Sequence, residues 1–425
     1  MNLNRKISPG FNTIEKLTFP QYDCLINSNN QKIYSLCAGI EPVVRIELVF
    51  DAGVMKQKVT GESSYTASML SEGTKSKSAL ALADALDYYG SYFQVKSNAE
   101  DLIATLYCLE KHVDNCLEYF MEAIISSIFP EKELEIIKKN AIQKLLVSNK
   151  KNSYLCRKNF YRNVLGPNHP LSAFPSKEDI QNINKEMLVS FYEENIIGGF
   201  KYAIVSGNFS DNSLKSISLA IEKSGLHNSN NEQEKQQINS TIGQHFITKN
   251  ESVQSSIRIG NISISRESED FRKLQFLNLI LGGYFGSRLM KNIREDKGLT
   301  YGIYSVLEPY KDFGIWYIDC ELNYKNREKG INEIWKELSR IKNEDISFEE
   351  IQSAKNYYLG SFLKSLDGPF SLADRLKIMV DYQLPDSYYP EFVTILNKTS
   401  SKDLMEIANK YFTENNMVKI IVGKE

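Results

Sequence analysis

The chain has 425 residues, of which 42% are hydrophobic and 24% are charged, a composition typical of a soluble globular protein with more than one domain. Its formal net charge of −2 lacks the basic excess of a nucleic-acid-binding surface, so we expect no nucleic-acid partner. No apolar run reaches the roughly 18 residues that a membrane span needs. The N-terminal segment lacks an apolar secretory core, which predicts a cytoplasmic protein; a periplasmic location would require a leader that has been removed.

The first half of the chain alternates short strands and helices. Residues 1–20 read as an extended arm, and the alternating apolar residues of Val43–Phe50 predict a strand. The elements expected after it are a helix at Ser78–Tyr89, a strand at Leu102–Leu109, helices at Cys116–Ile128, Glu131–Val147 and Lys185–Glu194, and a buried strand at Lys201–Gly207.

After a polar stretch that begins at His227, the same order of elements recurs. The second series is a strand at Ser255–Ile264, a glycine-punctuated helix, a strand with Trp316, Ile318, Cys320 and Leu322 on one face, and helices at Glu328–Ile341 and Phe348–Leu363. The offset between matching segments is about 210–220 residues, the size of a domain. We therefore predict an α+β fold of two homologous halves, 1–226 and 246–425, joined by a linker at 227–245. Each half is expected to be a mainly antiparallel sheet packed with helices.

The cysteines and histidines form no local motif. The six cysteines are Cys24, Cys37, Cys108, Cys116, Cys156 and Cys320. No two have the CxxC spacing, so we expect buried thiols in a reducing compartment. The four histidines are His112, His169, His227 and His245, too far apart for a local metal site. We expect His169 to lie on the solvent side of its Gly-Pro-Asn-His-Pro loop.

The stretch from Gly282 to Ser305 has the most specific pattern. A glycine-rich start leads into apolar residues with the spacing of one helical face, and Gly298 is expected to end this helix in the left-handed conformation. Arg294 in the last helical turn and Tyr301 beyond it could hold a peptide carbonyl or a developing oxyanion. The simpler alternative is that Arg294 complements the helix dipole and Tyr301 packs in a strand.

This stretch contains the motif GSRLxxxIRExxGLxY, at residues 286–301. Together with the duplication, it resembles the pitrilysin/insulinase-type zinc metallopeptidases, which include the mitochondrial processing peptidase and its bacterial relatives. The resemblance covers nearly the whole chain. It implies that Arg294 and Tyr301 bind substrate and that Gly282, Gly283 and Gly286 form a flexible substrate-contacting loop. The alternative for the glycines is that they only let the helix approach the sheet.

The zinc-binding residues of that family are missing. Catalytic members carry HxxEH in the first half and a third ligand on a downstream helix. The positions of the motif correspond here to Ser64, Ala67 and Ser68, and the window Ile136–Lys144 contains no carboxylate or histidine. Serine and alanine supply neither the imidazoles that bind zinc nor the carboxylate that deprotonates water. No HxxEH occurs anywhere in the sequence, so we expect this chain to bind no metal and the three small residues to serve close helix packing.

The resemblance therefore implies a non-catalytic, substrate-binding subunit of a two-chain zinc metallopeptidase that acts on peptides or unfolded proteins. The expected partner is an HxxEH-bearing paralogous subunit in a heterodimer, with the zinc in that subunit, or else a second copy in a homodimer. This chain would supply Arg294 and Tyr301 to the partner's zinc site. The alternative is a peptide-binding or structural scaffold protein without peptidase activity, which holds an extended peptide at a sheet edge.

Overall fold

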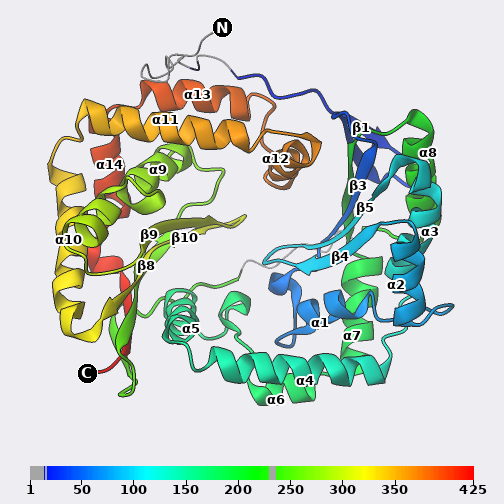
Figure 1. Ribbon diagram of the computed structural model, residues 1–425, viewed down its shortest axis with the longest axis horizontal. Coiled ribbons are helices and arrows are strands. Elements are labelled where there is room, and N and C mark those ends of the chain that lie inside the picture. Colours follow the sequence, from blue (N-terminus) through cyan, green and yellow to red (C-terminus); the bar gives the residue numbers. More distant parts are fainter. Residues whose placement is uncertain (1–13, 15–16, 229–235) are drawn as a thin grey trace, which may run out of the picture.

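The computed structural model describes residues 14, 17–228 and 236–425. They form two halves, each a sheet packed with helices, so the predicted α+β class is confirmed (Figure 1). None of the helices in the described ranges is both long enough and apolar enough to cross a bilayer.

The first half contains a six-stranded sheet with the strand order β1-β2-β6-β3-β5-β4. The strands are β1 (Asp23–Ile26), β2 (Lys32–Cys37), β3 (Val43–Phe50), β4 (Tyr92–Ser97), β5 (Leu102–Leu109) and β6 (Phe200–Gly207). Strands β2 and β6 run parallel, and all other neighbours are antiparallel. The central strand β3 is buried on both faces, although it carries Arg45 and Glu47. These two buried side chains form an ion pair at 3.1 Å.

The second half repeats this topology with five strands in the order β7-β11-β8-β10-β9. The strands are β7 (Gly243–Thr248), β8 (Gln254–Ser263), β9 (Ile303–Pro309), β10 (Gly314–Asn323) and β11 (Val418–Gly423). Strands β7 and β11 are parallel and the other pairs are antiparallel, which reproduces the first sheet without β1. A left-handed glycine precedes one edge strand of each sheet, Gly90 (φ +63°) before β4 and Gly298 (φ +59°) before β9. The duplication predicted from the sequence is therefore present in the fold.

Fourteen α-helices cover the two sheets in the described residues. Those of the first half are α1 (Glu62–Met69), α2 (Ala79–Tyr88), α3 (Val113–Ile125), α4 (Glu131–Ser148), α5 (Asn152–Leu165), α6 (Lys177–Asn182), α7 (Lys185–Tyr192) and α8 (Asp211–Lys223). Those of the second half are α9 (Phe271–Asn278), α10 (Arg327–Asn343), α11 (Phe348–Lys364), α12 (Pro369–Asp381), α13 (Tyr388–Lys398) and α14 (Ser401–Tyr411). Three π-helical turns are η4 (Glu193–Ile197), η5 (Leu279–Gly283) and η6 (Met290–Asp296).

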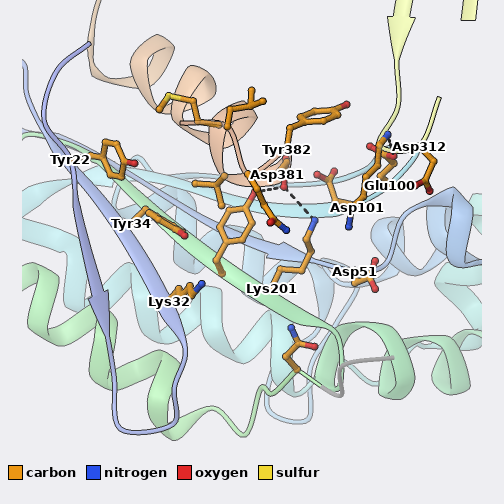
Figure 2. A pocket seen from close by; sticks show the side chains of 17 residues that line it. Tyr22, Lys32, Tyr34, Asp51, Glu100, Asp101, Lys201, Asp312, Asp381 and Tyr382 are labelled. Carbon is orange, nitrogen blue, oxygen red and sulfur yellow. Dashed lines mark hydrogen bonds and ion pairs between the residues drawn. The ribbon is translucent and has the colours of Figure 1, made fainter. Parts of the chain in front are cut away.

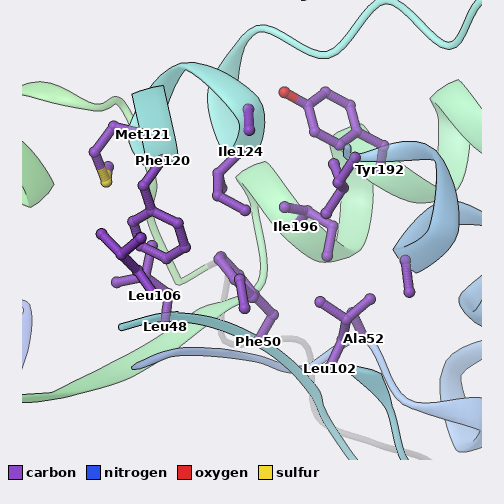
Figure 3. Close-up of a cluster of buried hydrophobic side chains, with 14 of the residues drawn as sticks. Leu48, Phe50, Ala52, Leu102, Leu106, Phe120, Met121, Ile124, Tyr192 and Ile196 are labelled. Carbon is purple, nitrogen blue, oxygen red and sulfur yellow. The ribbon is translucent and has the colours of Figure 1, made fainter. Parts of the chain in front are cut away.

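Each sheet has its own apolar core. In the first half, Phe50 and Leu106 of the sheet meet Phe120 of α3 in a fully buried cluster (Figure 3). In the second half, the face of β10 that begins with Trp316 and ends with Leu322 is buried as predicted. These contacts hold each set of helices against its sheet.

Two helices are exchanged between the halves. Helix α5 packs on β8 and β11 of the second sheet, where Phe160 lies in one buried cluster with Tyr317 and Ile420. Helix α12 packs on β2 and β6 of the first sheet, where Ala373 lies against Tyr202. Each sheet therefore takes one covering helix from the other half. The bounds 1–226 and 246–425 remain a prediction, because packing crosses them in both directions.

Some expectations lie outside the described residues or differ from the structure. Residues 1–13 and 15–16 of the predicted arm and 229–235 of the predicted linker are outside the described ranges. Strand β7 begins at Gly243, inside the linker segment 227–245. The burial expected for all six cysteines is wrong for Cys24 and Cys37, which are exposed because they lie on β1 and β2 at the margin of the first sheet.

Candidate functional site

Arg294 lies in the last turn of η6, which ends at the left-handed Gly298 as predicted. Its guanidinium stacks over the exposed ring of Phe285, with 5.1 Å between Cζ and the ring centroid. Within the described ranges the guanidinium has no hydrogen-bond or ion-pair partner. Its position is also favourable for the helix dipole. Arg294 is therefore a fixed cation with unused donors.

Tyr301 lies in the turn between Gly298 and β9, and its side chain is 88% exposed. It does not pack in a strand, and its hydroxyl has no partner among the residues that the structure describes. The turn itself is fixed, because Thr300 Oγ1 donates to the carbonyl of Glu321 at 2.7 Å and accepts from the N–H of Gly302 at 3.2 Å. A phenol presented by a fixed turn is available to a ligand or to a second chain.

The three glycines have different surroundings. Gly282 is buried, and a Cβ there would lie 2.6 Å from the backbone nitrogen of Ser305, so this glycine lets η5 approach β9. Gly283 is exposed, and Gly286 lies beside the ring of Tyr284. The packing alternative therefore applies to Gly282, whereas Gly283 is exposed and Gly286 is half-buried against Tyr284.

The positions that correspond to HxxEH lie on α1. Ser64 and Ser68 are exposed there, and their hydroxyls donate to the carbonyls of Gly61 and Ser64 at 3.0 and 2.9 Å. The expected close packing is therefore wrong for both serines, because their side chains face outward, and confirmed for the buried Ala67.

Helix α4 packs on α1 and carries the window in which the third ligand would lie. The exposed side chains of this window are Ile136, Lys139, Asn140, Gln143 and Lys144. Hydroxyls, amides and amines of this kind do not fit zinc, which takes thiolates, imidazoles and carboxylates in proteins. In the described part of the chain, no three His, Cys, Asp or Glu side chains could hold a metal ion together.

A cleft of about 1170 Å³ lies between the halves (Figure 2). Its walls come from Tyr22 just before β1, from β2 and β6, from the turns after β3, β4 and β9, and from the end of α12. Tyr34, Glu100 and Asp381 therefore face the same cleft. Neither Arg294 nor Tyr301 lines this cleft. Sequence reasoning missed it because its residues are scattered over segments from Tyr22 to Leu384, with no local motif.

Four of the charged residues that line the cleft are held in ion pairs, namely Asp51, Asp101, Lys201 and Asp381. The carboxylate of Asp381 accepts from Tyr202 at 2.6 Å, from Lys377 at 2.5 Å and from Lys201 at 3.3 Å. Although burial raises the pKa of Asp381, Lys377 and Lys201 together hold that pKa below its ordinary value. Burial, reinforced by Asp381, raises the pKa of the Tyr202 phenol well above its ordinary value. These groups hold α12 on the first sheet and are not poised for proton transfer.

His169 is buried between the halves, so its expected place on the solvent side is wrong. Its side chain is 2% exposed and packs edge-on against Phe313 of the second half, with 5.6 Å between ring centroids. Nδ1 accepts from the N–H of Leu171 at 3.2 Å, and burial lowers the pKa of the imidazole to about 4. The preceding helix α5 carries the loop into the contact between the halves, which the loop sequence does not reveal.

Two family models match the chain. Residues 38–169 match insulinase (peptidase family M16), and residues 182–358 match the peptidase M16 inactive domain. Together the two matches cover most of both halves.

Several similar proteins extend this match over the whole fold. A Bacillus subtilis protein named uncharacterized zinc protease YmxG is 23% identical over 367 residues, which are 86% of this chain and 88% of that protein. A Helicobacter pylori protein named non-peptidase homolog YmxG is 24% identical over 408 residues, 90% of each chain. The crystal structure of a peptidase M16 inactive domain from Pseudomonas fluorescens has a TM-score of 0.87 at 22% identity, over 96% of this chain and 99% of that one. With no zinc ligands at the positions of HxxEH, the chain belongs to the M16, or insulinase, peptidase family as a non-catalytic member.

Proposed function

We propose that this chain is the substrate-binding subunit of a two-chain zinc metallopeptidase that acts on peptides or unfolded proteins. The partner is an HxxEH-bearing paralogous subunit that holds the zinc, and this chain supplies Arg294 and Tyr301. One observation carries the proposal: the HxxEH positions of α1 and the window Ile136–Lys144 of α4 hold no zinc ligand, while Arg294 and Tyr301 keep donors that no other described residue uses.

In this role the guanidinium and the phenol hold the scissile peptide and stabilise the charge that develops on its carbonyl oxygen. A donor without an intramolecular partner breaks no protein hydrogen bond when it binds substrate. The ring of Phe285 beneath Arg294 restricts the orientation of the guanidinium, which reduces the entropy lost on binding. In this proposal the exposed Gly283 and the half-buried Gly286 contribute to the loop that contacts substrate.

The test begins with affinity purification from the native host, which should recover a chain of similar size with HxxEH. In a peptide-cleavage assay on the reconstituted pair, Arg294→Ala should lower turnover by on the order of 10²–10³ fold, the usual effect of losing one oxyanion donor. Tyr301→Phe keeps the ring but removes the hydroxyl, and it should also lower turnover. Size-exclusion chromatography should show an intact pair for both variants.

Matched controls separate this role from general surface effects. Lys291→Ala removes an exposed cation just after the start of η6, and Tyr88→Phe removes an exposed phenol from α2. Both should leave turnover within about twofold of the wild type, as expected for surface positions away from the chemistry. Unchanged turnover for Arg294→Ala in an intact pair would contradict the proposal.

The second candidate is a peptide-binding or scaffold protein without peptidase activity. It is supported by β4 and β9, which are edge strands of the two sheets and could each pair with an extended peptide. Under this function the protein purifies as a homodimer with no HxxEH chain, and a labelled unfolded polypeptide binds to it without being cleaved.

A further inference from the structure

The segment from residue 136 to residue 177 contains nine cations and no carboxylate. The cations are Lys138, Lys139, Lys144, Lys150, Lys151, Arg157, Lys158, Arg162 and Lys177. The whole chain has 51 cations and 53 acidic residues, so the acidic excess lies entirely in the rest of the molecule. The segment forms most of α4, all of α5 and the loop after it.

Few of these cations are neutralised locally. Lys138 pairs with Glu135 at 2.7 Å, and no other cation of the segment has a carboxylate within ion-pair distance in the described ranges. Arg157 lies over the ring of Phe174, with 5.4 Å between Cζ and the centroid. Lys249, from beyond β7, donates to the carbonyl of Lys150 and adds a further positive charge beside the segment. The fold therefore gathers positive charge here.

The exposed cations share their surface with apolar side chains. On α4, Ile136, Lys139 and Val147 follow a helical spacing that places them on one stripe, and Lys150 lies in the turn that follows the helix. Ile136, Leu146 and Val147 are 46%, 50% and 58% exposed. On α5, the half-buried Lys158 and the exposed Arg162 lie one turn apart. We define the α4–α5 basic surface as these apolar residues together with Lys139, Lys144, Lys150, Lys151, Arg157, Lys158 and Arg162.

This surface includes the window of α4 that lacks the third zinc ligand. Lys139 and Lys144 lie within that window, and α4 packs on the helix that carries Ser64 and Ser68. Of the exposed side chains in this window, Lys139 and Lys144 are amines and none is a carboxylate. The electrostatics of the surface favour an anionic ligand.

We propose that the α4–α5 basic surface binds an acidic polypeptide segment in which carboxylates alternate with apolar side chains. The cations of the surface would pair with the carboxylates of the peptide, and the exposed Ile136, Leu146 and Val147 would contact its apolar side chains. A nucleic-acid backbone offers few apolar groups to these residues. An anionic bilayer presents negative charge to a whole face of the molecule, so the acidic residues outside the segment would repel it. A peptide segment needs to contact only the α4–α5 basic surface. The proposal does not depend on Arg294 or Tyr301.

The test is fluorescence anisotropy of the full chain with a labelled peptide of about 15 residues that alternates Glu or Asp with Leu, which is on the order of 50 Å long when fully extended. Binding should weaken as salt is added. The double variant Lys144→Glu/Lys150→Glu should weaken it by about tenfold or more, because attraction becomes repulsion at two positions. Val147→Ser should weaken it several-fold, a change that a purely electrostatic site would not show.

The matched control is Lys215→Glu/Lys223→Glu on α8. These two lysines are exposed and have no ion pair with any residue that the structure describes, and they give the same change in net charge away from the surface. The control should leave the affinity within about twofold, as expected for charges beyond a Debye length. Equal weakening by both double variants would overturn the proposal. So would equally tight binding of a single-stranded oligonucleotide or of phosphatidylserine vesicles, or no peptide binding at low salt.

Discussion

His169 stays neutral in the folded chain because burial lowers its pKa to about 4, whereas an unfolded histidine titrates near pH 6.5. Between these values the unfolded chain binds a proton that the folded chain does not, so stability falls as the pH falls. The contribution is fully present above about pH 6.5, and up to about 3 kcal/mol is lost by about pH 4. We predict that His169→Asn, which keeps an acceptor for the N–H of Leu171 but does not titrate, loses less stability over this interval.

Urea unfolding midpoints at about pH 7.5 and about pH 4.5, on either side of the unfolded pKa, provide the measurement. Other carboxylates change the midpoint in both proteins, so the difference between wild type and His169→Asn is the quantity to compare. His227→Asn, at an exposed histidine, is the control and should follow the wild type. A wild-type midpoint that falls no more than that of His169→Asn would show that the imidazole is protonated in the fold.

A substitution at Gly282 distinguishes the two roles that the sequence leaves open for the glycines, a flexible substrate-contacting loop or close approach of the helix to the sheet. A Cβ at this position would meet the backbone of Ser305, so Gly282→Ala should destabilise the chain by about 1–3 kcal/mol through overpacking. Gly360 in α11 has open space around it, and Gly360→Ala should stabilise the chain by about 0.5–1 kcal/mol. Thermal midpoints of the two variants measure both effects. If Gly282→Ala left the thermal midpoint unchanged, the result would instead favour the role of Gly282 in a flexible substrate-contacting loop.

At the scale of elements, helix α12 is held on the first sheet by a buried ion-pair network. Lys377 binds Asp381 at 2.5 Å and also binds Asp101, and although burial lowers the pKa of Lys377, the two carboxylates raise it above its ordinary value. Lys377→Met should therefore cost about 3–5 kcal/mol, because it leaves buried carboxylates without a counter-charge. Urea unfolding measures the loss, and Lys364→Met at an exposed lysine of α11 should change stability by less than about 0.5 kcal/mol. Equal effects of the two variants would mean that the ion-pair network contributes nothing to the stability of the fold.

Local sequence patterns predict elements better than they predict which elements meet. Strands β3 and β5 have the predicted bounds because apolar alternation and an apolar run are properties of the segment itself. The amphipathic face of α5 shows that this helix packs, but not that it packs on the second sheet. For the same reason, local sequence patterns could not predict the burial of His169 or the cleft between the halves, because both depend on contacts between distant segments. Arg294, Gly298 and Tyr301 could be placed at a helix end because their motif is continuous in the sequence.

At the scale of the whole molecule, the exchange of α5 and α12 makes each half depend on the other. Without α5, the apolar face of β8 and β11 would be open to water, and without α12, so would β2 and β6. The two halves therefore resemble one folding unit more than two linked domains, because the contact between them includes covering helices of both sheets. Both tryptophans, Trp316 and Trp335, lie in the second half, so their fluorescence reports on that half alone.

We predict that unfolding in urea followed by tryptophan fluorescence and by far-ultraviolet circular dichroism gives coincident transitions. Phe120→Ala removes a fully buried ring from the core of the first half and should cost about 3–5 kcal/mol. Because the halves unfold together, this variant should lower the fluorescence midpoint as much as the circular dichroism midpoint, although both tryptophans lie in the other half. Phe160→Ala in α5 is the matched variant on the exchanged helix and should lower both midpoints as well. A fluorescence transition that does not respond to Phe120→Ala would mean that the second sheet folds independently, with α5 as a passive cover.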